Sequence, residues 1–323
     1  MCGIVGYLGN RVAQDALIDG LRRLEYRGYD SAGAAFHDGN AFSLARETGR
    51  VENLAATLRE SNPTSTLGIA HTRWATHGAV TVSNTHPHLS YDGKIALVHN
   101  GVIENYGPLK RILEGKGIEF SSETDSEVLS NLIAYHYARL EGEEDRFAQA
   151  LREALPQCRG AYGIAVLCVD EPGFLLGARR GSPLVVGLGD GETFLASDAS
   201  AFVGRVRDAV YLKDGEIALL REDGFRIITM QGEDAQAVSQ PIDQTVEDVE
   251  MGDFDSFMEK EIFEQPVALE NTLRGRFGDD GTTAKLGGLE GHEDELRRLD
   301  RIVFVACGTA RHSCMVGEYL IER

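Results

Sequence analysis

The hydrophobic and polar positions at the start of the chain follow a strand period and then a helix period. An apolar run at 2–8 predicts a strand next to the N-terminus, and apolar residues recur at helical spacing from 12 to 24. Two further apolar runs, at 32–37 and 41–47, flank Asp38-Gly39, a dipeptide typical of hairpin turns. The N-terminal region therefore predicts a strand, a helix and a hairpin.

The same reasoning extends to residue 140. A second helix is expected from about 51 to 62, because Pro63 disfavours its continuation, and strands are expected at 67–72 and 95–100. The strongest helical pattern covers 124–140, where the initial threonine and Glu127 have the spacing of a capping box. This helix is predicted to be amphipathic.

A different pattern follows the helix that ends near Pro156. Short apolar segments alternate with Gly, Pro and Asp turns, which indicates antiparallel strands rather than strand–helix–strand units. The predicted strands cover 161–169, 173–178, 183–188, 192–197, 209–212, 216–221 and 225–230.

The composition changes after Met230. The next two dozen residues are polar, acidic and nearly free of aromatic side chains, which is typical of a linker. A helix is expected at 257–273, and residues 301–323 read as a strand, a glycine turn and a helix. We therefore expect a domain over 2–230, a linker with a connecting helix over 231–290, and the start of a second, α/β domain over 291–323.

The overall composition narrows the classes of function. With 323 residues, of which 42% are hydrophobic, the chain can bury a substantial core, and its formal net charge of −19 disfavours nucleic acid and anionic membranes as partners. No apolar run approaches the ~20 residues of a membrane helix. The five cysteines form no CxxC pair, so we expect reduced thiols, no disulfide framework and a cytoplasmic protein.

Cys2 is the first candidate for chemistry. A small residue at position 2 normally permits removal of the initiator Met, which would leave a thiol and a free α-amine on one residue. The amine has a reference pKa of ~7.7–8.0, which suits it to accept the thiol proton. On Cys2 alone, the ordinary interpretation as a small residue at the start of a strand is favoured.

Several histidines gather within thirty residues. Their spacing lacks the i, i+4 pair of a helical metal site, and we expect the side chains of His86 and His88 to diverge. Hydrogen-bonded structural histidines are therefore favoured over zinc, and no metal is expected. The histidines are His71, His77, His86, His88 and His99.

Four further residues carry suggestive chemistry. Asn100-Gly101 is a turn by default, although two adjacent amides also suit an oxyanion hole. Arg73 and Asp125 offer the guanidinium and carboxylate that would hold a free amino acid, but surface ion pairs, or for Asp125 a charge at a helix N-terminus, are commoner interpretations. The glycine of the segment 307–310 matches phosphate-binding motifs only weakly.

Taken together, the motifs resemble class II glutamine amidotransferases. CGIVGYLG at 2–9 is similar to the N-terminus of the whole superfamily. Other segments resemble a narrower family, the glutaminase half of the isomerising glutamine:fructose-6-phosphate aminotransferases. They are LRRLEYRGYDSAG at 21–33, HTRWATHG at 71–78, NTHPH at 84–88, VHNGVIEN at 98–105, SETDSEV at 122–128, CRGAYG at 158–163, RRGSPLVVGLG at 179–189, FLASDASA at 194–201, FMEKEIFEQP at 257–266 and FVACGTA at 304–310.

The resemblance implies a fold, a reaction and roles for individual residues. The fold would be α+β, an N-terminal nucleophile hydrolase with a four-layer αββα sandwich over 2–230. The reaction would be hydrolysis of L-glutamine, with ammonia passing through a channel to a sugar site and with no cofactor. The implied roles are Cys2 as nucleophile, Asn100 and Gly101 as oxyanion donors, Arg73 and Asp125 as ligands of the α-carboxylate and α-amine, Thr76 and His77 as pocket residues, and Trp74 as a gate.

The last segment resembles the opening of a sugar isomerase domain. Thr309 would be a remnant of its sugar-binding loop, in which Ala310 replaces the serine usual in the family. We expect this chain alone to be a glutaminase, with fructose 6-phosphate a substrate only of the complete enzyme, which would be a homodimer. Two alternatives stay open: the glutaminase part of another class II amidotransferase, or a catalytically silent regulatory or oligomerisation module.

Overall fold

The computed structural model describes most of the chain. It covers residues 2–322 apart from 76–77, 141, 143–144, 223, 250–251, 253, 279–283, 286, 290 and 307–308. The chain divides into two compact units, Met1–Gly252 and Asp253–Arg323, and each is described by itself.

The first unit is built on two β-sheets, and every pairing between their named strands in the described residues is antiparallel. The larger sheet contains, in spatial order, β14 (Ser239–Pro241), β11 (Asp208–Tyr211), β9 (Val185–Leu188), β10 (Glu192–Ala196), β1 (Gly3–Gly9), β4 (Leu67–Arg73), β2 (Ser31–His37) and β3 (Phe42–Thr48). The smaller contains β13 (Gly224–Thr229), β12 (Glu216–Arg221), β8 (Leu175–Arg180), β7 (Gly160–Cys168), β6 (Ile95–Ile103) and β5 (His88–Leu89).

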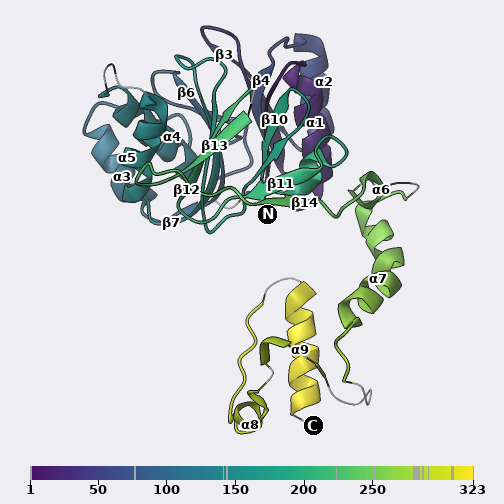
Figure 1. Cartoon of the computed structure of the whole chain (residues 1–323). Helices are drawn as coiled ribbons and strands as arrows, with labels where there is room; N and C mark the ends of the chain where they lie inside the picture. The colour runs from purple at the N-terminus through teal and green to yellow at the C-terminus, as the bar shows by residue number, and fades with distance from the viewer. Residues whose placement is uncertain are drawn as a thin grey trace. The chain divides into compact units, whose positions relative to one another are not determined.

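Helices cover the outer face of each sheet (Figure 1). Helices α1 (Ala13–Leu24) and α2 (Val51–Ser61) lie on the larger sheet, while α3 (Tyr106–Glu114), α4 (Asp125–Tyr137) and α5 (Arg146–Ala154) lie on the smaller one. Short 3-10 helices cover Glu25–Arg27, Leu155–Gln157 and Ala199–Phe202. The predicted αββα sandwich is therefore confirmed.

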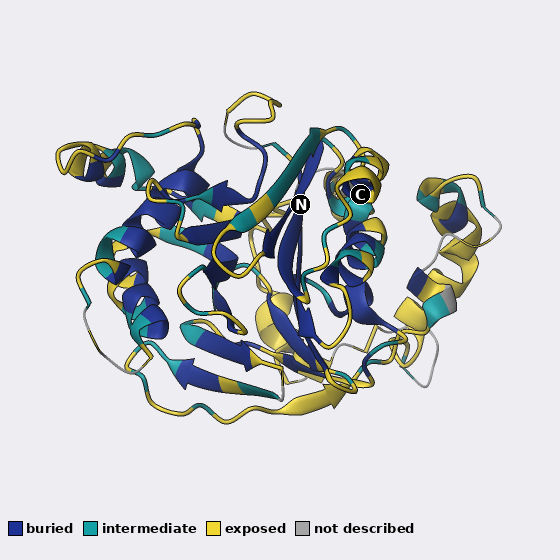
Figure 2. Cartoon of the chain, turned by 90° about the horizontal axis from the view of Figure 1, so that it is seen from above, coloured by how far each residue is buried: buried dark blue, intermediate teal, exposed yellow. Residues whose placement is uncertain are grey.

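Three apolar clusters hold the four layers together. One lies between the helices α1 and α2 and the larger sheet, one between the two sheets, and one between the smaller sheet and the helices α3 to α5. Figure 2 shows these buried residues running through both sheets and the inner faces of the helices. The middle cluster contains Ile4 of β1 and Val98 of β6, so it fixes the distance between the strand that Cys2 directly precedes and the strand that contains Asn100.

Helix α4 differs from its prediction. Residues Asp125 to Ala134 are all buried, so the amphipathic interpretation is wrong. The reason is tertiary, because α4 packs on β6 and also contacts both α3 and α5. The capping box is formed only in part. Thr124 accepts the N–H of Glu127 at 3.3 Å, whereas the Glu127 carboxylate accepts the N–H groups of Ser121 and Ser122.

The compact unit also extends beyond the expected boundary at residue 230. Strand β14 pairs with β11, and Ile242 packs against the cluster under α1 and α2. The short helix α6 (Val246–Val249) precedes the end of the unit at Gly252. These late elements are short and polar, which is why their sequence resembles a linker.

In the second unit, α7 (Phe257–Leu273) has the predicted bounds, and Ser256 caps it by accepting the N–H of Glu259 at 3.2 Å. Residues 301–306 form no strand, so that prediction is wrong for this structure. An isolated apolar run has no neighbouring strand with which to pair. The 3-10 helix Gly287–Leu289 and the helices α8 (Glu293–Leu296) and α9 (Thr309–Ile321) complete the unit. None of the helices in the described part is long and apolar enough to cross a membrane.

Candidate active site

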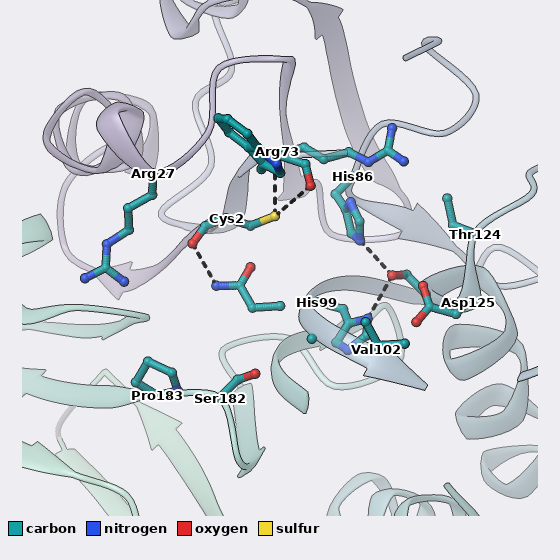
Figure 3. Close-up of a pocket in the computed structure, with 14 residues that line it drawn as sticks. Cys2, Arg27, Arg73, His86, His99, Val102, Thr124, Asp125, Ser182 and Pro183 are labelled. Atoms are coloured by element: carbon teal, nitrogen blue, oxygen red, sulfur yellow. Dashed lines mark hydrogen bonds between the residues drawn. The ribbon is translucent and has the colours of Figure 1, made fainter. Parts of the chain in front are cut away.

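One cavity of about 330 Å³ collects most of the predicted site residues (Figure 3). It lies in the first unit and is lined by the residue before β1, by the end of β4, by β6 and by the N-terminus of α4. The predicted residues that line it are Cys2, Arg73, Trp74, Asn100, Gly101 and Asp125. Thr76 and His77 lie outside the described residues, and so does the side chain of Thr309, the first residue of α9.

Cys2 stands directly before β1, and its thiol faces the end of β4. The Trp74 N–H donates to Cys2 Sγ at 3.2 Å, and the Trp74 carbonyl lies 3.5 Å from the same sulfur. Burial raises the pKa of the Cys2 thiol, while the Trp74 hydrogen bond and the charge of Arg73 lower it in part. Because the net direction is upward, the thiol is protonated near neutral pH and needs a base to become a nucleophile.

Asn100 is held between Cys2 and a buried histidine. Its Nδ2 donates to the Cys2 carbonyl at 3.1 Å, and its Oδ1 lies 3.0 Å from His71 Nε2. The default interpretation of Asn100-Gly101 as a turn is wrong, because β6 continues through both residues and they pair with Gly163 and Tyr162 of β7. The partner strand decides this outcome, since the dipeptide itself favours turns.

Gly101 occupies a backbone position that excludes side chains. Its φ is 131°, and a Cβ built there would lie 2.1 Å from the Ala161 carbonyl oxygen. The close approach of β7 therefore requires glycine next to Asn100. As a result, residue 101 has no side chain beside its backbone amide.

We expect Gly101→Ala to lower the free energy of unfolding by at least about 2 kcal/mol, because backbone strain and a clash with fixed backbone add together. Urea unfolding measures this. Gly117→Ala is the matched control, because Gly117 also has a positive φ, 82°, but a Cβ there meets nothing within 4 Å. Equal losses in the two variants would contradict the close approach of β7.

Arg73 and Asp125 are buried charges at the end of β4 and the start of α4, with 3% and 5% of their surfaces exposed. Arg73 donates from Nη1 to the Ala79 carbonyl at 3.3 Å, and burial lowers its pKa. Asp125 Oδ2 accepts the Ile103 N–H at 2.8 Å. Because both line the cavity, the interpretation as surface charges is wrong, although Asp125 is indeed the first residue of a helix.

The histidines form a buried, hydrogen-bonded cluster beside the cavity, and His86 and His99 line it. His86 Nε2 and His99 Nδ1 share the Ser126 hydroxyl at 2.8 and 2.9 Å, and His88 Nε2 lies 3.0 Å from Thr124 Oγ1. The expected divergence of His86 and His88 is wrong, since their ring centroids lie 4.7 Å apart across a cis His86-Pro87 bond. In the part of the chain that is described, no His, Cys, Asp and Glu side chains form a group suited to a metal.

Burial also sets the charge of these rings. It lowers the pKa of His71 to about 3 and lowers the pKa values of His86 and His88 well below the usual range, with neighbouring positive charges acting in the same direction. The rings are therefore neutral at physiological pH. Neutral rings bonded to hydroxyls fit the structural role that the sequence favoured.

The mouth of the cavity contains residues that the sequence reasoning did not single out. Arg27 lines it and forms an ion pair with Asp198, and Ser182 and Pro183 lie across the cavity from Cys2 (Figure 3). Trp74, which the resemblance did single out, is half exposed there, and its indole meets the Tyr29 ring edge to face at 5.8 Å. The available signal for Arg27, Ser182 and Pro183 was their position inside the long motifs at 21–33 and 179–189.

One cavity thus brings together a cysteine, the Asn100-Gly101 amides and two buried side chains of opposite charge, which are groups that an acyl-transfer site would use. A family model described as "Glutamine amidotransferase domain" matches residues 71–204. The structure of glutamine phosphoribosylpyrophosphate amidotransferase from B. subtilis, complexed with ADP and GMP, superposes with a TM-score of 0.60 at 26% identity, covering 71% of this chain and 49% of that one. The chain thus has the fold of the class II glutamine amidotransferases.

Comparison with curated protein sequences identifies more similar relatives within this class. The chain is 46% identical to the glutamine--fructose-6-phosphate aminotransferase [isomerizing] of Chlorobaculum tepidum over 330 residues and to that of a Thermus thermophilus strain over 322. Each match covers 100% of this chain and 52% of the relative. The chain is a homologue of the glutaminase region of these aminotransferases, and it spans about half the length of the curated relatives it matches.

Proposed function

We propose that this chain hydrolyses L-glutamine to L-glutamate and ammonia, with Cys2 as the nucleophile. The observation that carries the proposal is the convergence of Cys2, the Asn100-Gly101 amides and the buried pair Arg73 and Asp125 on one cavity. A nucleophile without head-group ligands would suit many amides. The added guanidinium and carboxylate favour a substrate that carries both an α-carboxylate and an α-ammonium group.

The proposed first half-reaction forms a thioester. After removal of Met1, the α-amine of Cys2 accepts the thiol proton, and the sulfur attacks the side-chain amide carbon of glutamine. A carbon–sulfur bond forms, the carbon–nitrogen bond breaks, and the transferred proton leaves on nitrogen as ammonia. Water then adds to the thioester carbonyl, the carbon–sulfur bond breaks, and one proton of that water restores the thiol as glutamate departs.

Asn100 and Gly101 would stabilise the charge that develops on the amide oxygen. Asn100 Nδ2 already lies beside the Cys2 carbonyl at 3.1 Å, so a small movement directs it at a tetrahedral oxyanion bound to Sγ. The Gly101 amide follows on the same strand. Donors placed in advance in a partly dry cavity lower the barrier without reorganisation at the moment of reaction.

The acceptor of the ammonia is proposed from the relatives. The printed name of those proteins specifies fructose 6-phosphate, and we propose that a complete protein containing this chain passes ammonia to that sugar to form glucosamine 6-phosphate in the cytoplasm. In this proposal Trp74 gates the route, Thr309 belongs to the sugar site, the complete protein is a homodimer, and no cofactor takes part. Another class II acceptor is less well supported, since the phosphoribosyl relative is only 26% identical.

The head-group ligands provide the first test. Arg73→Lys keeps the charge but loses the planar fork, so kcat/KM for glutamine should fall at least about tenfold, or about 1.5 kcal/mol. Asp125→Asn should lower kcat/KM for glutamine similarly, because a neutral amide does not balance the charge of the substrate ammonium group. Steady-state release of glutamate measures both, and Arg59→Lys, an exposed arginine of α2, is the matched control.

Alkylation of Cys2 shows whether Arg73 and Asp125 bind the substrate or only maintain the structure around the nucleophile. A small electrophilic thiol reagent needs Cys2 but no head-group ligands, so both variants should be alkylated at nearly the wild-type rate. If glutamine turnover and alkylation fall in parallel, Arg73 and Asp125 support Cys2 structurally, and their assignment to the substrate is wrong.

A further inference from the structure

His71 lies between the two sheets and touches the proposed oxyanion residue. It belongs to β4 and is 1% exposed, and its Nε2 lies 3.0 Å from Asn100 Oδ1 and 3.2 Å from the His99 carbonyl oxygen. His71 does not line the cavity, so it has no direct access to a substrate.

The two contacts locate the proton on the imidazole ring. A carbonyl oxygen and an amide oxygen are both acceptors, so His71 Nε2 must carry a hydrogen. The ring is neutral near pH 7, because burial lowers its pKa to about 3. A neutral ring has one N–H, so Nδ1 is unprotonated, and that buried atom has no hydrogen-bond partner in the structure.

The position of this proton decides which way the Asn100 amide points. The oxygen and nitrogen of an Asn side chain are nearly equal in size, so only hydrogen bonds distinguish the two orientations. With Nε2–H on the His71 side, Oδ1 must face the ring, and Nδ2 is directed to the Cys2 carbonyl. The flipped amide would set two donors against each other and present an acceptor to a developing negative charge.

We propose that His71 is a positioning residue that holds Asn100 with its Nδ2 presented to the reacting amide. This inference rests on the proposed function, because it assigns His71 a role only through Asn100. Strand pairing fixes the backbone of Asn100 but not its side-chain amide, which two hydrogen bonds hold, one from Nδ2 to the Cys2 carbonyl and one from His71 Nε2 to Oδ1. When Nδ2 turns from the Cys2 carbonyl to the reacting amide, the His71 contact is the one of these two that still holds the orientation.

The test compares variants that lack an N–H donor at position 71 with a variant that retains one. His71→Phe and His71→Met remove the N–H. In both variants kcat for glutamine should fall ~10- to 100-fold, while KM should change less than about threefold. The loss in kcat is smaller than the ~10²- to 10³-fold loss that follows removal of an oxyanion donor itself. His71→Gln retains an N–H donor and should keep at least about a third of the wild-type kcat. His37→Phe removes another buried histidine, remote from the cavity, and should leave kcat unchanged.

A double-mutant cycle separates positioning from general support. Once Asn100→Ala has removed the amide, adding His71→Phe should change kcat less than about twofold. An additional loss equal to that of the single variant would overturn the proposal. If Asn100→Ala itself leaves kcat unchanged, the oxyanion assignment in the proposed function fails instead, which is a separate result.

A measurement on the wild-type protein does not depend on how the variants fold. Long-range ¹H–¹⁵N NMR of the His71 ring should show a neutral imidazole with its proton on Nε2 between pH 6 and pH 8. A proton on Nδ1 would leave Nε2 unable to donate to Asn100, and the proposal would then be wrong.

Discussion

Cys2→Ala should abolish glutamine hydrolysis while leaving the protein folded. The change removes the sulfur that forms the thioester, and we expect kcat to fall by at least ~10⁴-fold. Stability should change by less than about 1 kcal/mol, because Cys2 is only half buried and the alanine retains the carbonyl that accepts Asn100 Nδ2. Glutamate release and urea unfolding measure the two quantities.

Cys158→Ala is the matched control, because this second cysteine is buried in the cluster under α4 and α5 and does not line the cavity. It should lose some stability but little activity. Residual activity of the Cys2→Ala protein within tenfold of wild type would refute the assignment of the nucleophile. Intact mass adds a further check, since retention of Met1 in an active preparation would exclude the α-amine as base.

Acid should unfold this protein from an unusually high pH. The folded pKa values of His71, His86 and His88 are lowered by burial, to about 3 for His71, whereas an unfolded histidine titrates near 6.5. Below about pH 6.5 the unfolded chain therefore binds protons that the folded chain does not. The stability contributed by the neutral rings is complete above that pH and is lost as the pH falls toward the folded pKa values.

The free energy of unfolding should depend steeply on pH. Each histidine contributes up to about 1.4 kcal/mol per pH unit, and the three together contribute up to about 4 kcal/mol per pH unit. Urea midpoints between pH 7.5 and pH 5 would measure it. His88→Gln removes one titrating ring but keeps a polar group that can hydrogen-bond Thr124, so the slope should fall by about a third. If the slope between pH 6.5 and pH 5 corresponds to the uptake of less than one proton on unfolding, these rings titrate in the folded state and the prediction is wrong.

Local periodicity was sufficient for most of the secondary structure. Helix α7 has the bounds that its sequence predicts, and the seven segments predicted as strands from 161 to 230 all became antiparallel strands. Apolar spacing and turn residues are local properties, so they can be read without knowledge of neighbours. The failures occur where a neighbour decides the outcome: residues 301–306 have no partner strand, and β7 keeps Asn100-Gly101 extended.

The sequence also determined which side chains have the chemistry for amide hydrolysis. Cys2, Arg73 and Asp125 were identified by their functional groups and by motif resemblance, but neither indicates a distance. Cys2 meets Trp74 across 72 positions of the chain and Asn100 across 98, because β1 pairs with β4 and the second sheet packs against both. The role inferred for His71 depends on the same packing. A histidine acquires a defined proton position only when its buried acceptors are in place, and the tertiary structure alone brings those acceptors to the ring.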